Sequence, residues 1–198
     1  MDYSSRVSIV TYMRFLNTIL DIIFPNKCVA CQKAGADLCV SCLSQAPAAE
    51  RESAKWIFPI FDYRHPPIQK ALQLFKYKNK KRLAVVFAEV LHGKIMEELS
   101  ELSLMQNFRQ AILIPLPLAK KRRRERGYNQ AELLCKALIK LDKEENFTLE
   151  KHILIKPRET EHQARIRDRS ARLKNIAGSF AVKNPESIKE ENIILIDG

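Results

Sequence analysis

The stretch Ile112–Leu134 reads ILIPLPLAKKRRRERGYNQAELL and decides the fold of this chain. The apolar run at its start, residues 111–114, is typical of a buried parallel strand. Pro115 and Pro117 end this strand, because neither can donate a hydrogen bond to a ladder. A dense basic turn at 120–126 and a helical pattern follow. This order places cations and a helix N-terminus at the carboxyl edge of a parallel sheet, where phosphates and pyrophosphate bind, unless the cations form a solvated charge run.

The composition narrows the range of partners and compartments. A chain of 198 residues is one ordinary domain, or one domain with a small appendage, and its 46% hydrophobic content is enough for a core. The 34 basic residues outnumber the 23 acidic ones and give a net charge of +11, which favours an anionic partner: nucleic acid, a phosphorylated metabolite or anionic lipid. The apolar stretch at residues 7–24 is too polar to span a membrane and lacks a signal-peptide cleavage site, so we expect a cytoplasmic protein without a membrane span.

Four of the five cysteines form two C-x-x-C steps, which is typical of a zinc site with four thiolate ligands. These cysteines are Cys28, Cys31, Cys39 and Cys42. An all-cysteine set leaves no open coordination position, so the predicted zinc is structural. An iron–sulfur cluster, a disulfide pair or coincidence are the alternatives. The fifth cysteine, Cys135, falls on the apolar side of a predicted helix and is expected to be a small buried hydrophobe.

Hydrophobic periodicity and chain-breaking residues predict the other elements. The predicted helices are Val7–Phe24, Ile68–Tyr77 after Pro66 and Pro67, Leu83–Leu104 with Gly93 as a kink, and Gln130–Lys140. The predicted strands are Trp56–Tyr63 at a sheet edge because of Pro59, a buried strand at His152–Ile155, and a final strand at Asn192–Ile196. Residues 45–53 are predicted to be a linker.

Several of these segments resemble the ComF (competence protein F) family. The matching residues are Pro115–Leu118, Arg122 and Arg126–Glu132 in the central stretch, Phe24-Pro25-x-x-Cys28 before it, and the basic turn that begins at Lys76-Tyr77. A second block, Arg158-x-Thr160-x-x-Gln163 followed by Arg172-x-x-Asn175, and the ending Ile193–Asp197 also match. The resemblance therefore extends from Phe24 to Asp197. The turn at 76–82 has a solvated basic loop as its alternative interpretation.

The ComF resemblance implies a fold and a chemistry. It implies a type I phosphoribosyltransferase-like α/β domain at 51–198, with a mostly parallel sheet and helices on both faces, after a zinc-binding segment at 1–50. The implied reaction is attack on C1 of phosphoribosyl diphosphate, bound with magnesium, with loss of pyrophosphate; the acceptor is unknown. Catalysis in this class depends on positioning and electrostatics rather than on a covalent residue. The implied substrate-binding residues in the central stretch are Arg122, Arg126, Gly127, Asn129 and Gln130.

The resemblance also assigns the carboxyl-terminal third of the chain. It places Arg158, Thr160, Gln163 and Arg172 on a flexible loop that closes over the diphosphate, with a basic amphipathic helix docked on the sheet as the alternative. It makes Asp197 the first of two acids that hold the ribose hydroxyls. The printed sequence has a glycine in place of the second acid and stops before the Thr-Thr-Gly-x-Thr phosphate loop. The expectation is therefore that this chain does not itself catalyse phosphoribosyl transfer.

A nucleic-acid function is the alternative to a transferase. The family is linked to uptake of single-stranded DNA in natural competence, beside a helicase-like partner. The cations of 120–126 and 76–82, with Tyr77 and Tyr128 next to them, could bind a nucleic-acid backbone and stack its bases. Because DNA and phosphoribosyl diphosphate both require cations, the sequence does not separate an accessory DNA-binding protein from a transferase. A degenerate remnant without a present function is the third interpretation.

Overall fold

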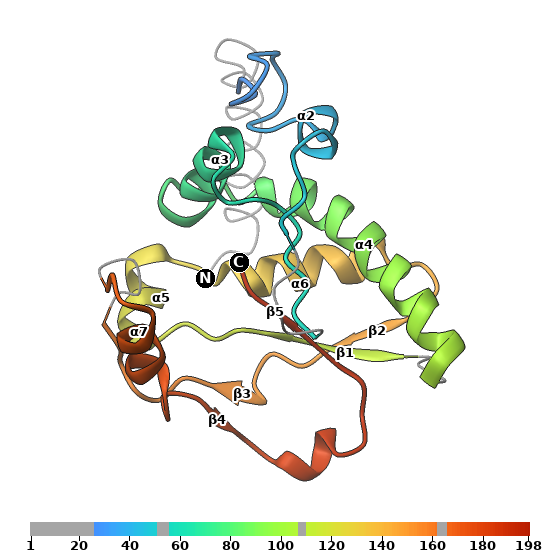
Figure 1. The fold of residues 1–198 in the computed structure, drawn as a ribbon, viewed down its shortest axis with the longest axis vertical. Helices are drawn as coiled ribbons and strands as arrows, with labels where there is room; N and C mark the ends of the chain where they lie inside the picture. The colour runs from blue at the N-terminus through green and yellow to red at the C-terminus, as the bar shows by residue number, and fades with distance from the viewer. Residues whose placement is uncertain (1–25, 51–55, 107–109, 162–165) are drawn as a thin grey trace, which may run out of the picture.

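The computed structural model describes residues 26–50, 56–106, 110–161 and 166–198. The predicted helix at Val7–Phe24 lies outside the described residues, as do part of the linker and Gln163. The described chain is a mixed α/β protein built around a small parallel sheet (Figure 1).

Three strands form the central sheet, in the order β2-β1-β5. They are β1 (Ala111–Pro115), β2 (Phe147–Leu149) and β5 (Ile193–Ile196), and both neighbours of β1 run parallel to it. The predictions of a buried parallel strand at 111–114 and of a strand ending before Asp197 are confirmed. The carboxyl ends of β1 and β5 lie together, since Pro115 is in register with Ile196.

Helices cover one face of this sheet. Helix α6 (Gln130–Leu141) packs on all three strands, and α4 (Leu83–Gln106) packs on α6 (Figure 1). Cys135 and Leu138 of α6 are fully buried against Leu113 of β1, so the prediction that Cys135 is a buried hydrophobe is confirmed. The predicted long helix is also confirmed, and it continues through Gly93 without interruption.

The opposite face of the sheet differs from the expectation of helices on both sides. Ile193 and Leu195 of β5 point away from α6 and are 42% and 53% exposed. In the part of the chain that the structure describes, no second helical layer covers these side chains. Successive side chains of a strand alternate between faces, and only one face of β5 contributes to the described core.

The segment before α4 joins the four clustered cysteines to the core. Helix α3 (Pro66–Tyr77) begins at the two prolines as predicted, because proline suits the first turn of a helix. The short helix α2 (Val40–Ser44) packs on α4, and Leu43 is fully buried there. Phe75 of α3 is also fully buried.

The basic segment at 120–126 is a helix, not the predicted turn. Helix α5 (Lys120–Arg126) has seven residues, and none of them is buried. Lysine, arginine and glutamate are all good helix formers, so the segment can fold as a helix without an apolar face once it is flanked by ordered structure. Gly127 ends the helix in the left-handed region, with φ +77°, and its N–H donates to the carbonyl of Arg123 at 2.9 Å.

This left-handed stop gives a testable expectation. Gly127→Ala should lower the free energy of unfolding by about 1–2 kcal/mol, because a Cβ is strained at positive φ. The matched control is Gly93→Ala in the interior of α4, where an added Cβ meets no atom within 4 Å. That change should stabilise the protein by about 0.5–1 kcal/mol. Urea denaturation measures both; an unchanged Gly127→Ala midpoint would contradict the assigned conformation.

The predicted edge strand at Trp56–Tyr63 is wrong. These residues form turns and irregular backbone, and Trp56 is 79% exposed. The Asp62 carboxylate accepts hydrogen bonds from the backbone N–H of Arg64 at 2.8 Å and from its side chain at 3.1 Å, an arrangement typical of a turn. The apolar residues of this segment pack on helices instead, as Phe61 does against Phe87.

The buried strand predicted at His152–Ile155 is present only at its last two residues, and it lies outside the central sheet. The strand beside β1 is β2, which starts five residues earlier; its first N–H, from Phe147, donates to the Asp142 carboxylate at 2.8 Å. Residues Leu154–Ile155 form β3 and pair antiparallel with β4 (Ala181–Val182) in a separate sheet. Helix α7 (Arg169–Ile176) lies between β3 and β4 in sequence, and the 3-10 helix η2 (Pro185–Ile188) leads to β5. Short apolar runs therefore predicted a strand but not its sheet.

Candidate functional site

The four cysteines of the C-x-x-C steps come together as predicted. Their Sγ atoms all lie within 4.8 Å of one another, and those of Cys31 and Cys39 are 3.8 Å apart. A tetrahedral ion with Zn–S bonds of about 2.3 Å separates its sulfur ligands by about 3.8 Å. The donor set and its spacing therefore fit a zinc ion, and these residues could hold one.

Backbone hydrogen bonds shape this cluster. The N–H of Cys28 donates to the carbonyl of Lys33 at 2.9 Å, and the N–H of Gln32 donates to the carbonyl of Cys28 at 3.0 Å. The N–H of Cys39 donates to the Cys28 sulfur at 3.4 Å. The last ligand, Cys42, lies in the first turn of α2, where its N–H donates to the carbonyl of Cys39 at 3.1 Å. Each C-x-x-C step is thus a tight turn that presents two sulfurs to one point.

The thiols of the cluster are electrostatically coupled. Burial disfavours the Cys28 thiolate, but backbone hydrogen bonds from Cys31, Cys39 and Ala30 outweigh it and lower the pKa of Cys28 to about 6. Hydrogen bonds with the side chains of Cys39 and Cys31 raise the pKa of Cys42 to about 12. A divalent cation held by the four sulfurs would deprotonate these thiols outright.

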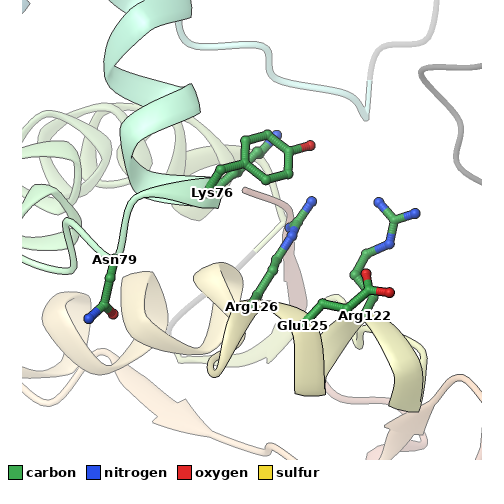
Figure 2. Close-up of a pocket in the computed structure, with 6 residues that line it drawn as sticks. Lys76, Asn79, Arg122, Glu125 and Arg126 are labelled. Carbon is green, nitrogen blue, oxygen red and sulfur yellow. The ribbon is translucent and has the colours of Figure 1, made fainter.

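A pocket of about 250 Å³ lies between the end of α3 and helix α5 (Figure 2). Its lining residues are Lys76, Tyr77, Asn79, Arg122, Glu125 and Arg126. Arg122 and Arg126 are one helical turn apart, and Figure 2 shows their guanidinium groups on the same side of α5. The lining therefore contains three cationic side chains and one carboxylate, which give the pocket a net positive charge.

The pocket lies at the carboxyl edge of the sheet. Asp197 directly follows β5, and its carboxylate interacts electrostatically with Lys76. Burial lowers the pKa of Lys76; the Asp197 carboxylate raises it, and Arg126 lowers it further. Gly198 lies against Gln130 at the start of α6, because a Cβ added to that glycine would come within 2.9 Å of the Gln130 Cβ. The basic segment, the start of α6 and Asp197 therefore lie at the same edge of the sheet.

Gln130 and Arg126 join the walls of the pocket. The Arg126 guanidinium donates to Gln130 Oε1 at 2.9 Å and lies 5.1 Å from the centroid of the Tyr77 ring. Gln130 Nε2 donates to the carbonyl of Lys76 at 3.4 Å. Gln130 is nearly fully buried, so it fixes the end of α3 relative to α5 rather than offering free donors.

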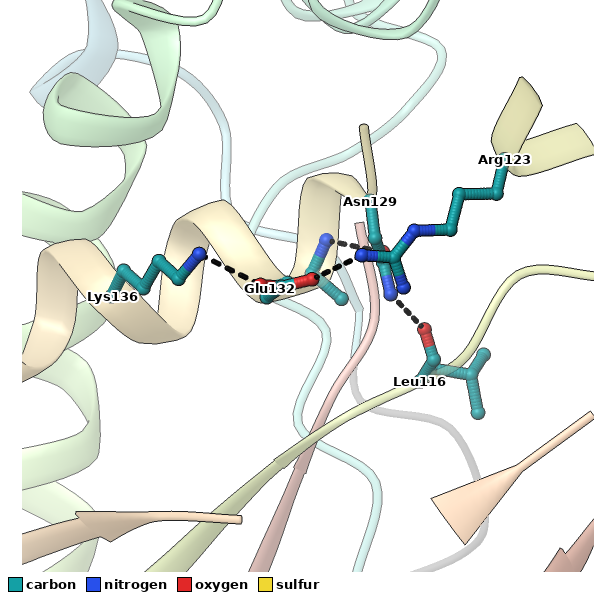
Figure 3. A network of polar contacts seen from close by, with 6 residues as sticks. Leu116, Arg123, Asn129, Glu132 and Lys136 are labelled. Carbon is teal, nitrogen blue, oxygen red and sulfur yellow. Dashed lines mark hydrogen bonds and ion pairs between the residues drawn. The ribbon is translucent and has the colours of Figure 1, made fainter. Parts of the chain in front are cut away.

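Asn129 fixes the start of α6 (Figure 3). Its Oδ1 accepts from the N–H of Ala131 at 3.1 Å, and its Nδ2 donates to the carbonyl of Leu116 at 3.0 Å, just after β1. Glu132 of the same turn pairs with Arg123 at 3.2 Å and with Lys136 at 2.7 Å. Burial raises the pKa of Glu132, but the hydrogen bond from Lys136 and the charges of Lys136 and Arg123 outweigh it and lower that pKa. Arg123 thus pairs with α6 and, unlike Arg122 and Arg126, does not line the pocket.

The cap at Asn129 gives a second expectation for stability. Asn129→Ala removes a helix cap and leaves the Leu116 carbonyl unpaired, so it should lower the free energy of unfolding by about 1–3 kcal/mol. The matched control is Asp168→Ala, which removes the cap of α7, an exposed helix with no buried residues. The control should change global unfolding by less than 1 kcal/mol. Equal losses of unfolding free energy in the two variants would show that the hydrogen bond between Asn129 and the Leu116 carbonyl contributes nothing to stability.

The remaining predicted site residues lie outside the lining of this pocket. Arg158 and Thr160 follow β3, and Arg172 lies on α7, where its Nε donates to the carbonyl of Ile166 at 2.7 Å. This segment contacts the start of α5, since Glu159 Oε1 accepts from the N–H of Lys121 at 3.0 Å. Gly127 acts as the stop of α5, and no ligand atom is needed to explain it.

Sequence reasoning missed that the turn at 76–82 lies beside α5, although it named the cations of this turn and Tyr77 as candidate nucleic-acid contacts. Lys76, Tyr77 and Asn79 line the pocket. Lys156 was also missed: burial lowers its pKa, and the nearby charge of Arg122 lowers it further. The signal for the first group was present in the Lys76-Tyr77 match to the family turn.

Comparison with protein-family models and with curated proteins gives no match for this chain. In the described part of the chain, none of the helices has the length and apolar character needed to cross a membrane. The assignment of a function therefore depends on the chemistry of the pocket and the cysteine cluster.

Proposed function

We propose that this protein is ComF-like and binds phosphoribosyl diphosphate or pyrophosphate in the pocket between α3 and α5. The observation that carries the proposal is the convergence of Lys76, Arg122 and Arg126 at the carboxyl edge of a parallel sheet, next to Asp197. Phosphorylated ligands bind at such edges, where strands end and helices begin. A type I phosphoribosyltransferase-like fold is part of this proposal, and the strand order β2-β1-β5 with parallel neighbours supports it.

Each residue has a distinct role in the proposed site. The two guanidinium groups present forked donors that suit the oxygens of a diphosphate, and Lys76 adds a compact positive charge. Asp197 accepts hydrogen bonds from ribose hydroxyls at the opposite end of the ligand. Magnesium, when bound with the diphosphate, neutralises part of the ligand's charge. The residues bind and orient the ligand electrostatically, without a covalent step, and phosphoribosyl transfer by this chain is not part of the proposal.

The segment with Arg158, Thr160 and Arg172 is the proposed cover of this site. Helix α7 has no buried residue, so it can shift with little loss of core packing. The contact of Glu159 with the start of α5 holds the segment beside the cations. Movement toward the pocket would bring further arginines to the diphosphate and exclude water.

Binding of single-stranded nucleic acid is the second candidate function. The observation that favours it is Tyr77, whose ring is 55% exposed beside the cations of the pocket. Exposed aromatic rings next to a basic groove stack bases with little sequence preference. Tyr128 does not share this role, because it is buried and its hydroxyl donates to the carbonyl of Phe75. A place beside a helicase in a DNA-uptake apparatus belongs to this second candidate.

A competition experiment separates the two candidates. A labelled single-stranded oligonucleotide is titrated with the protein at fixed salt, and pyrophosphate is then added. If the pocket serves both ligands, pyrophosphate displaces the DNA, and Tyr77→Ala weakens DNA binding about tenfold, more than it weakens pyrophosphate binding through the lost contact with Arg126. If the pocket serves the diphosphate only, pyrophosphate does not displace the DNA, and Tyr77→Ala leaves the DNA affinity unchanged. Tyr63→Ala, at another half-exposed tyrosine, is the matched control. Failure of pyrophosphate to bind would reject the first candidate.

A further inference from the structure

The turn between α3 and α4, residues 78–82, connects the cysteine cluster to the anion pocket. On the side of the cluster, Lys80 Nζ donates to Asn26 Oδ1 at 2.6 Å and pairs with Asp37 Oδ1 at 2.9 Å. Asn26 is two residues before Cys28, and Asp37 is two residues before Cys39. One side chain therefore contacts the residues that lead into both C-x-x-C steps.

On its other side, the same segment forms a wall of the pocket. Lys76 and Tyr77 end α3, and Asn79 lies between them and Lys80. The backbone here is tightly turned: Asn79 has a φ of +56°, and the N–H of Lys80 lies 3.5 Å from the carbonyl of Leu74. A shift of Lys80 is thus transmitted over one peptide unit to Asn79 and over three to Tyr77.

The contact between Lys80 and Asp37 is largely removed from water. The Asp37 side chain is 9% exposed, and that of Lys80 is 35% exposed. A nearly buried carboxylate without its cation is strongly disfavoured, so the two groups hold each other in place. Asp37 is itself held in the cysteine segment, because its carbonyl accepts from the N–H of Val29 at 2.9 Å.

The position of Asp37 depends on an ordered cysteine segment. A segment this short has few buried side chains of its own, such as Leu38 and Leu43, and metal binding is coupled to the folding of such segments. We therefore expect that removal of the metal releases Asn26 and Asp37 from their positions, so that Lys80 loses both partners. The wall of the pocket is then no longer anchored from this side.

We propose that Lys80 is a positioning residue that couples metal occupancy of the cysteine cluster to the affinity of the anion pocket. The metal-loaded protein binds pyrophosphate more tightly than the metal-free protein, and the coupling is lost without the Lys80 side chain. The pocket half of this inference rests on the proposed diphosphate function. Because Lys80 also holds Asn26 and Asp37 in the cysteine segment, its removal also weakens metal binding.

The first test measures metal binding without any anion. Zinc is titrated away from the full-length wild-type protein and from Lys80→Met with a chromophoric chelator. We expect about tenfold weaker zinc binding in Lys80→Met, within the usual range of coupling between sites. Lys78→Met, on the same turn and exposed, is the matched control and should match the wild type. Lys80→Arg retains a cation that can reach Asp37, so it should recover most of the affinity. Equal zinc affinity in the wild type and Lys80→Met would overturn the proposal.

The second test measures the coupling itself. Pyrophosphate affinity is determined calorimetrically for the wild type and Lys80→Met, each with zinc and after chelation. Chelation should weaken wild-type binding about tenfold, whereas Lys80→Met should start weaker and lose little more. An equal fold-loss in both proteins would overturn the proposal, because a purely structural role of Lys80 gives additive effects. Absence of pyrophosphate binding by the zinc-loaded wild type would instead reject the diphosphate function, and the zinc titration would still decide the role of Lys80.

Discussion

Replacing Cys39 with serine should reduce bound zinc from one equivalent per chain to less than half an equivalent. The sulfur of Cys39 is 3.8 Å from that of Cys31, and the backbone N–H of Cys39 donates to the sulfur of Cys28. The substitution therefore removes one ligand of a set whose geometry fits a tetrahedral ion. Structural zinc sites bind with about 10–16 kcal/mol of apparent free energy at neutral pH, and this free energy is also folding free energy.

The loss of order should be confined mostly to the residues before Ala49. Most of the hydrophobic core, around Leu113, Cys135 and Leu138, comes from the α/β part, although the same cluster also includes Cys28. Elemental analysis of purified protein measures the zinc, and amide exchange locates the disorder. Cys135→Ala is the control for thiol loss; it should retain one equivalent of zinc although it removes a buried side chain. Undiminished zinc in Cys39→Ser would contradict the four-cysteine site. Iron in the purified protein, together with a visible absorption band, would show that the cysteines hold an iron–sulfur cluster instead of zinc.

The double substitution Arg122→Ala with Arg126→Ala should weaken pyrophosphate binding about a hundredfold or more. Each guanidinium lines the pocket, and a hydrogen bond to a charged group contributes about 1.5–3 kcal/mol. Two such losses correspond to two or more factors of ten in affinity. If the pocket also binds single-stranded DNA, that affinity should fall with salt with a log–log slope of about −0.7 per phosphate contact, and the double variant should flatten this slope.

The matched control for this variant is Lys120→Ala with Arg124→Ala. Both residues are exposed on the same helix, and neither lines the pocket. The control removes the same two charges, so it separates a specific site from the general field of a protein with a net charge of +11. Equal losses of pyrophosphate affinity in the two double variants would show that α5 is a solvated basic face without a specific anion site.

The parts of the fold that sequence predicted best are those with local signals. The strand β1 was predicted because an apolar run and two prolines occur within a few residues of each other. The cysteine cluster was predicted because the spacing of its ligands is set by their own turns. Helix α5 was not, since a charge run without an apolar face has no periodicity that distinguishes a helix from a turn.

The parts that sequence could not predict depend on contacts between distant residues. The strand beside β1 is the three-residue β2, and its pairing depends on the sheet and not on its own composition. Lys76 becomes a pocket residue because it lies opposite Arg122 and Arg126 of α5, which are distant from it in the chain. Lys80 likewise finds its partners 43 and 54 positions earlier, at Asp37 and Asn26.

Calorimetric titration of the protein with phosphoribosyl diphosphate and magnesium tests the diphosphate pocket most directly. The convergence of Lys76, Arg122 and Arg126 beside Asp197 leads us to expect saturable one-to-one binding in the micromolar range, abolished by the Arg122 and Arg126 double substitution. No binding at millimolar ligand, or binding that survives this double substitution unchanged, would contradict the assignment of the pocket.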